Sequence, residues 1–196
     1  GLFIGEGRAP LDAAVALSQK TNINYLEKSI QKCVVYLEPR EFKRTWIGNK
    51  AVYRTRMAIG DGGELIILAP GVSGFGEDDV VDRIIRRYGY CGREEMLGLF
   101  REQPDLRENM GAAAHLIHGS SDGRFRITYA VKKMTAKEIA GVHYHPADYD
   151  DMARRYDPDK LSPGWNTLDD GEDIYFISNP ALGLWVDKDK FYPEKT

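Results

Sequence analysis

The chain has 196 residues, of which 42% are hydrophobic and 29% charged, and its formal net charge is −3. These values are ordinary for a soluble globular fold with one substantial core. Because there is no basic excess, we expect neither a nucleic acid nor a membrane surface as partner. No apolar run reaches the roughly 18 residues of a membrane span, and no signal peptide is recognisable. The two cysteines lie in no paired motif, which favours a reducing, cytoplasmic setting.

Expected strands and helices alternate along the chain. Strands are predicted at 2–5, 33–39, 64–70, 124–131 and 173–178, and helices at 10–20, 76–90, 93–103, 106–119 and 135–142. The last helix has Thr135 as N-cap and Glu138 in position to complete a capping box. From residue 147 to 196 we expect an irregular extension of the same domain, with one short helix. The alternation indicates an α/β fold with a largely parallel sheet and flanking helices.

The stretch from residue 46 to 60 is ambiguous. Read with a period of two, it resembles a strand; read with a helical period, it places Trp46, Lys50 and Tyr53 on one face. The pair Gly62–Gly63 before an apolar strand is typical of a helix end followed by a tight turn. We therefore predict a helix over 46–60 that ends near Gly62, with the three side chains facing one open groove.

Two glycine-rich loops do not favour phosphate binding. GEGRAP, at 5–10, resembles a dinucleotide fingerprint, but Pro10 stands where the third glycine is required. The loop at 69–79 leads into a helix whose start carries Glu77, Asp78 and Asp79. Their charge repels phosphate, so helix capping is favoured over anion binding.

The four histidines form two pairs, His115 with His118 and His143 with His145. Neither pair has a thiolate or acidic partner at a recognised metal spacing, so no metal site is predicted. Three alanines before His115 allow another element to pack closely. We expect this helix end to border a cleft, with His115 facing it. The alternative is a helix packed through its alanines with a polar end.

Lys50 is the candidate for chemistry. Surface solvation is the ordinary state of a lysine. Its neighbours Trp46, Asn49 and Tyr53, however, form the mixed aromatic and polar lining that surrounds ligands. A lysine point charge suits an anionic substrate such as a carboxylate.

Several segments together resemble the C-terminal half of the nickel-dependent lactate racemase family. They are LFIG and VVYL, then WIGNKAVYRTRMAIGDGGELIILAPGVSGFGED, IRRYGYCGR and AAAHLIHGSSDGRFRITY. The resemblance implies the C-terminal half of a two-domain enzyme, with the active site between the domains. It also implies a nickel pincer nucleotide, bound by the N-terminal domain, that accepts a hydride from C2 of a 2-hydroxy acid. The family's nickel ligand, cofactor lysine and catalytic histidines belong to that N-terminal domain.

The family's Tyr-Gln-x-x-Lys motif aligns with Trp46, Ile47 and Lys50, counted back from the Gly-Gly pair. The resemblance implies that Lys50 is catalytic and holds the substrate carboxylate. It also implies that Trp46 and Ile47 contact the substrate. From the lining of Lys50 and from the alanine-rich helix end, we expect Asn49, Tyr53 and His115 to take part in binding it. Because the tyrosine and glutamine are replaced, a 2-hydroxy acid other than lactate, such as a sugar acid, is expected.

Two functions therefore remain open. The first is the substrate-side domain of a nickel-pincer racemase or epimerase, whose partners are a 2-hydroxy acid and its own N-terminal domain. On this reading the isolated chain is inactive and binds neither cofactor nor nickel tightly. The second is a non-catalytic α/β module that binds a nucleotide or a protein partner.

Overall fold

The computed structural model of the protein describes residues 1–191. Its centre is a six-stranded sheet in the order β5-β4-β3-β2-β7-β6, and β6 alone runs against its neighbours. A smaller parallel sheet pairs β1 with β8. The predicted α/β class with a largely parallel sheet is confirmed. The strands are β1 Ile23–Leu26, β2 Ile30–Tyr36, β3 Ile59–Ala69, β4 Arg126–Val131, β5 His145–Asp148, β6 Gly164–Thr167, β7 Asp173–Ile177 and β8 Leu184–Asp187.

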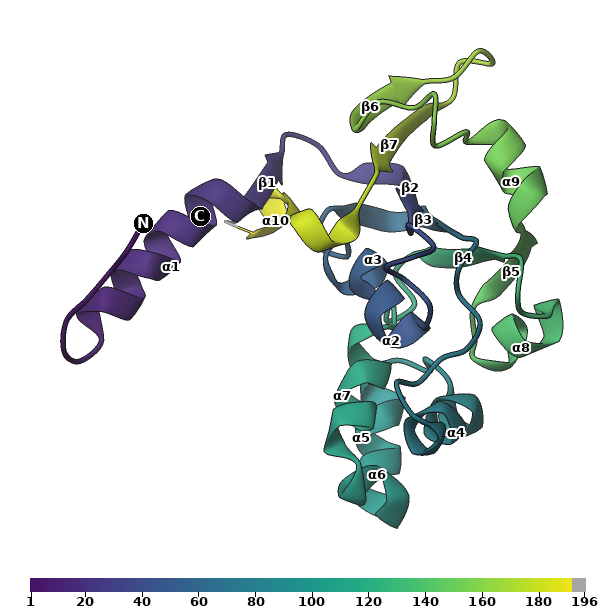
Figure 1. The fold of residues 1–196 in the computed structure, drawn as a ribbon, viewed down its shortest axis with the longest axis horizontal. Helices are drawn as coiled ribbons and strands as arrows, with labels where there is room; N and C mark the ends of the chain where they lie inside the picture. Colours follow the sequence, from purple (N-terminus) through teal and green to yellow (C-terminus); the bar gives the residue numbers. More distant parts are fainter. Residues whose placement is uncertain (192–196) are drawn as a thin grey trace.

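Helices flank the larger sheet, and α4 to α7 form a lobe below it in Figure 1. The single helix predicted at 106–119 is two helices, because Asn109 leaves helical geometry with φ −124° and ψ 60°. Thr135 and Glu138 form the predicted capping box. The helices are α1 Ala9–Asn22, α2 Thr45–Gly48, α3 Lys50–Tyr53, α4 Asp79–Tyr88, α5 Arg93–Glu102, α6 Pro104–Glu108, α7 Met110–His118, α8 Ala136–Gly141, α9 Tyr149–Arg155 and α10 Lys188–Phe191, with a 3₁₀ turn, η1, at Pro180–Leu182.

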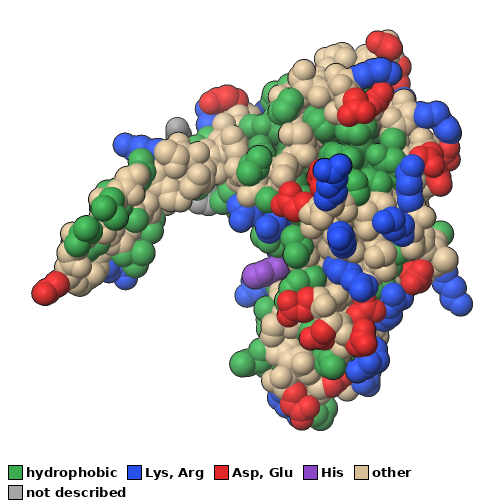
Figure 2. All heavy atoms as spheres, viewed as in Figure 1, with side chains coloured by type: hydrophobic (Ala, Val, Ile, Leu, Met, Phe, Trp, Pro, Cys, Tyr) green, Lys and Arg blue, Asp and Glu red, His purple; other side chains and the backbone are tan. Residues whose placement is uncertain are grey.

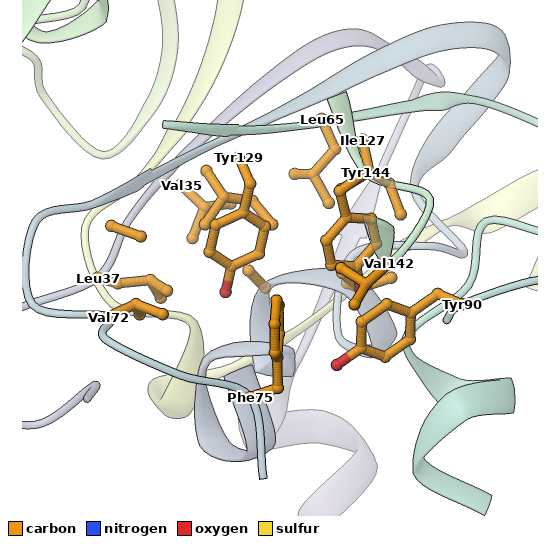
Figure 3. Close-up of a cluster of buried hydrophobic side chains, with 14 of the residues drawn as sticks. Val35, Leu37, Leu65, Val72, Phe75, Tyr90, Ile127, Tyr129, Val142 and Tyr144 are labelled. Atoms are coloured by element: carbon orange, nitrogen blue, oxygen red, sulfur yellow. The ribbon is translucent and has the colours of Figure 1, made fainter. Parts of the chain in front are cut away.

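The two faces of the larger sheet bury separate cores. Along β3, Leu65 and Ile67 face the core shared with α2, α3, α4 and α7, while Ile66 and Leu68 face the core under α9. This alternation follows from the period of two in a strand. Figure 3 shows part of the larger core, where aromatic side chains from the sheet and from the loops lie together.

The predicted helix over residues 46–60 is wrong beyond Tyr53. The chain leaves helical geometry after α3, and β3 begins at Ile59, so the glycine pair lies inside a strand. In the pairing of β2 with β3, Ile30 faces Ile59 and Lys32 faces Glu64, which forces the intervening glycines of β3 into a bulge. Gly62 has φ +77° there. A bulge and a helix end both require positive φ, so the glycines alone do not distinguish them.

The two ends of the described chain also differ from expectation. Residues 2–5, predicted as a strand, have no regular structure. Residues 147–191 hold more regular structure than an irregular extension, because β6 and β7 join the larger sheet. The short strands β1, β5, β6 and β8 were not predicted, since each has only four residues and shows little apolar alternation.

Helix α1 projects away from the body of the molecule (Figure 1) and buries none of its residues. The small sheet at its base is held by backbone bonds, in which Trp185 N–H donates to the carbonyl of Arg54 (2.9 Å) and Asp187 N–H to that of Met57 (3.0 Å). The segment that follows α3 therefore anchors the projecting arm.

Candidate functional site

Helices α2 and α3 form one short helical segment whose start is fixed by the loop before α4. The N–H groups of Thr45 and Trp46 donate to the carbonyls of Gly74 (3.1 Å) and Phe75 (2.8 Å). Asn49 interrupts the segment with φ −68° and ψ 1°, and α3 then follows for one turn. The loop thus sets where the side chains of α2 and α3 point.

The structure brings Trp46 and Tyr53 against the end of α7. The ring of Trp46 lies 4.6 Å from that of His115, and the ring of Tyr53 lies 6.2 Å from that of His118, between centroids. Lys50 lies between the two aromatic residues in the chain, four residues after Trp46 and three before Tyr53. Ile47, next to Trp46, is 43% exposed.

The ammonium group of Lys50 has no counter-charge. Three lysines of the described residues are partly buried, namely Lys32, Lys50 and Lys188. Lys32 pairs with Glu64 and Glu172, and Lys188 pairs with Glu27. Lys50 forms no ion pair or side-chain hydrogen bond with any residue of 1–191. Lysine and arginine side chains and one histidine gather where the arm meets the lobe, at a hollow corner seen in Figure 2.

Asn49 points into the protein instead of toward a ligand. It is fully buried, and its Nδ2 donates to the hydroxyl of Tyr144 at 2.9 Å. That hydroxyl donates in turn to the carbonyl of Gly119 at 2.7 Å. A Cβ on Gly119 would lie 2.4 Å from the Tyr90 ring, so the glycine is required for close packing. Asn49 therefore supports the helix from inside the protein.

Three tyrosines stack beneath this segment. The ring of Tyr144 lies 4.5 Å from that of Tyr90 and 5.4 Å from that of Tyr129, both nearly parallel (Figure 3). All three are buried, and burial raises the pKa of each phenol. Two enclosed atoms of this region, Asn49 Oδ1 and Tyr129 Oη, have no hydrogen-bond partner in the described chain.

His115 is joined to α2 by hydrogen bonds. Its Nε2 lies 3.0 Å from the hydroxyl of Tyr90, which lies 3.0 Å from Oγ1 of Thr45. The residue is 8% exposed. Burial, together with the nearby His118, lowers the pKa of His115 to about 4. The imidazole is therefore neutral at physiological pH, and His118 is the more exposed of the two.

The loop at 69–79 caps a helix, as predicted. Asp78 accepts a bond from the N–H of Val81 at 2.8 Å. Asp82 closes the loop by accepting from the N–H groups of Phe75 (2.7 Å) and Gly76 (3.1 Å). Burial opposes ionisation of Asp82, but the bond from Arg86 and these two amide bonds lower its pKa. The amides of this loop are thus already occupied by a carboxylate of the chain.

Metal and membrane signatures are lacking in the part of the chain that the structure describes. No three His, Cys, Asp or Glu side chains of residues 1–191 lie close enough together to hold a metal ion. None of the described helices combines the length and the apolar character that crossing a membrane requires.

A hollow of about 670 Å³ lies away from Lys50, between α9 and the loop that leads to β7. Its charged lining carries both signs, with Arg154, Arg155 and Lys160 beside Asp157 and Asp170. Several of these side chains pair with one another, including Arg155 with Asp170 and Lys160 with Asp157. We therefore place the candidate site at Lys50, because a charge without a partner is a stronger indication of a ligand than volume.

The sequence did not indicate Thr45, Tyr90 or Tyr144 as parts of the site. These residues are far apart in the chain and follow no periodic pattern. A sequence feature that could have indicated close packing here is Gly119, directly after His118. Its missing side chain makes room for Tyr90.

Comparisons with known proteins identify the fold. No protein-family model matches the chain, and no curated protein matches it. Similar solved structures include a protein from Thermotoga maritima, with a TM-score of 0.68, 19% identity, and coverage of 90% of this chain and 41% of that one. They also include the lactate racemase apoprotein from Thermoanaerobacterium thermosaccharolyticum, with a TM-score of 0.56, 12% identity, and coverage of 89% and 39%. The chain thus has a lactate-racemase-like fold and spans about two fifths of each matched structure.

Proposed function

We propose that this chain is the substrate-side domain of a racemase or epimerase for a 2-hydroxy acid, in which Lys50 binds the substrate carboxylate. The supporting observation is that Lys50, a partly buried residue, has no counter-charge for its ammonium group among residues 1–191. A compact ammonium charge suits a carboxylate. The fold shared with a lactate racemase is the reason for choosing a 2-hydroxy acid over other anions.

The other residues of the segment shape the site around that charge. Trp46, held against His115, forms a flat wall one turn before Lys50. Ile47 adds an exposed apolar edge. The family's tyrosine and glutamine are absent at these two positions, so the proposed substrate is a 2-hydroxy acid other than lactate, such as a sugar acid. Tyr53 and His118 close the other end of the wall.

The cofactor is assigned to a separate domain. The described residues offer no set of three metal ligands, and no chemical step is assigned to the nickel pincer nucleotide here. We propose that an N-terminal domain of the full-length protein binds the cofactor and completes the site against Lys50. The isolated chain is then inactive and binds no nickel tightly.

One observation favours the second candidate function, a binding module without chemistry. The projecting arm exposes apolar side chains that a soluble surface does not need, and α1 buries none of its residues. They include Leu2, Ile4 and Leu11, which are 83%, 86% and 58% exposed. Under the first proposal these side chains pack on the N-terminal domain, whereas under the second they pack on another protein.

The deciding experiment is a chirality assay of the full-length protein, reconstituted with the nickel pincer nucleotide, on a panel of 2-hydroxy acids. Interconversion of the two enantiomers or epimers of at least one acid, lost in Lys50→Ala, is expected. If equilibrium dialysis of the 196-residue chain finds one tightly held nickel ion, the assignment of the cofactor to a separate domain is contradicted. Absence of turnover with every acid would favour the binding module.

A further inference from the structure

The protons between α2, Tyr90 and His115 can be assigned by counting donors. Thr45 has one hydroxyl proton, and it is donated to the carbonyl of Phe75 at 3.1 Å, since a carbonyl only accepts. The 3.0 Å bond between Thr45 and Tyr90 must therefore use the proton of Tyr90. The oxygen of Tyr90 then accepts from His115, so Nε2 of His115 carries the proton. A neutral imidazole protonated at Nε2 has a bare Nδ1.

The bare Nδ1 of His115 has no hydrogen-bond donor in the described chain. It is also not among the fully enclosed side-chain atoms without a partner there, which are Asn49 Oδ1 and Tyr129 Oη. The residue as a whole is 8% exposed. This nitrogen is therefore the free acceptor of the ring.

Resting on the proposed function, we infer that Thr45 and Tyr90 fix His115 as the Nε2-protonated tautomer, so that Nδ1 accepts a hydrogen bond from a second hydroxyl of the substrate. Trp46 connects the two ends of this site, because it touches His115 and lies one helical turn from Lys50. One ligand then binds both residues, with its carboxylate on Lys50 and its second hydroxyl on Nδ1 of His115. The substrate class is a 2-hydroxy acid with a further hydroxyl, as in glycerate or a longer sugar acid.

The surroundings of His115 keep it in the accepting form. Tyr90 and Trp46 contact the ring, and His118 lies one turn along α7. None of these supplies a negative charge that would favour an imidazolium. Burial and His118 both lower the pKa of His115, so Nδ1 stays unprotonated across the neutral range. Tyr90 acts here as a positioning residue, because it touches His115 and not the ligand.

The tautomer can be read directly from ¹⁵N NMR of the histidine rings in the 196-residue chain, where protonated and bare nitrogens differ in chemical shift. We expect Nε2–H for His115 in the native chain and in Thr45→Ser, which keeps the accepting hydroxyl. Thr45→Val, of nearly equal volume, frees the Tyr90 proton to turn toward His115, and this is expected to move the ring proton to Nδ1. Native His115 protonated at Nδ1, or a Thr45→Val spectrum unchanged from native, would overturn the inference.

Tyr144→Phe is the matched control for stability. Like Tyr90, Tyr144 is a buried phenol in the same ring stack, but its hydroxyl bonds Asn49 and Gly119 instead of His115. Both Tyr90→Phe and Tyr144→Phe remove one buried hydroxyl. Only Tyr90→Phe is expected to release His115 into a mixture of tautomers. An equal mixture in Tyr144→Phe would mean that the tautomer reports packing alone.

Ligand binding tests the acceptor. With glycerate and lactate as probes, we expect glycerate to shift the Nδ1 signal and to bind Thr45→Val roughly 2- to 10-fold more weakly, the effect of one neutral hydrogen bond. Lactate, which lacks the second hydroxyl, is expected to leave Nδ1 unmoved. If glycerate binding depends on Lys50 but does not shift the Nδ1 signal, this inference is overturned and the proposed function is not. If neither acid perturbs Lys50 or His115 at tens of millimolar, this inference is overturned, while the proposed function is decided by the chirality assay of the full-length protein.

Discussion

On one face of the larger sheet a partly buried lysine has acidic partners, and on the other face a partly buried lysine has none in the described chain. On the α9 face, Lys32 of β2 pairs with Glu172 and lies 3.9 Å from Glu64. Burial opposes its charge, but the bond that it donates to Glu172 and the neighbouring Tyr156 and Glu64 raise its pKa. On the α7 face, Lys50 has no such partner in the described chain.

The surroundings of the two lysines differ in the same way. Glu172 also accepts bonds from Arg155 (2.8 Å) and the hydroxyl of Tyr156 (3.0 Å), and Glu64 accepts from Thr128 at 2.7 Å. Charge on that face is balanced within the protein. Lys50 has no acidic partner in the described chain, Asn49 is turned into the core, and His115 is uncharged at physiological pH. A cation without an internal counter-charge is available to an external anion, whereas a paired one is structural.

The largest expected effect is a loss of turnover when Lys50 is replaced. Lys50→Ala in the full-length protein removes one charge-assisted contact, which typically costs about 2 to 4 kcal/mol of transition-state stabilisation, or roughly 30- to 1000-fold in rate. The melting temperature should hardly change, because no internal partner is lost. Turnover by chirality assay and thermal unfolding measure the two quantities.

Lys132→Ala is the control for Lys50, since it removes an exposed lysine that pairs with Asp150 on the protein surface at 2.6 Å. It should leave turnover near that of the native protein. Near-native turnover in Lys50→Ala, or unfolding of that variant, would show that Lys50 is a surface or structural residue.

The second effect concerns protonation of His115, which its burial disfavours. The folded-state pKa of His115 is about 4, against an ordinary value of 6.5. As pH falls below 6.5, the unfolded chain takes up a proton at this residue before the folded chain does, so stability is lost between pH 6.5 and 4. At pH 5 the loss is about 2 kcal/mol.

Denaturant unfolding of the 196-residue chain between pH 7 and 5 measures this loss. His115→Gln, whose amide can still donate to Tyr90, should be less stable at pH 7 but should lose about 2 kcal/mol less on acidification. NMR titration of the native ring should show no protonation above pH 5. A midpoint near the ordinary value, or an unchanged slope in the variant, would contradict the lowered pKa.

The features that the sequence predicted are those set by neighbours in the chain. The amphipathic pattern of α4 and the capping box of Thr135 and Glu138 each depend on residues within one or two turns, and both are confirmed. The bulge at Gly62 was mistaken for a helix end because both structures ask for the same backbone torsion.

The hydrogen-bonded chain from Thr45 through Tyr90 to His115 had no sequence signal, because its members come from a helix start, a loop and another helix. Lys50 itself was indicated by its aromatic and polar neighbours and by a family resemblance, and its lack of a counter-charge became visible only in the structure. Contacts that depend on how distant segments meet cannot be obtained from periodicity.

The smallest expected effect is a loss of stability when Lys32 is replaced. Lys32→Met keeps most of the side-chain volume but leaves Glu64 and Glu172 without their shared cation. Because the pair is partly exposed, with the lysine side chain 28% accessible, we expect a loss of only about 1 kcal/mol. For a chain of this size, that lowers the melting temperature by about 2 to 4 °C.

Salt distinguishes this loss from a packing defect. At about 1 M salt the screening length falls to roughly 3 Å, so the difference between native protein and Lys32→Met should shrink. Lys50→Met is the matched variant on the other face. It removes an unpaired cation, so its stability should equal or slightly exceed that of the native chain at both salt concentrations. If Lys50→Met is destabilised as much as Lys32→Met, and salt reduces both losses equally, then Lys50 has an internal partner and the contrast between the two faces is wrong.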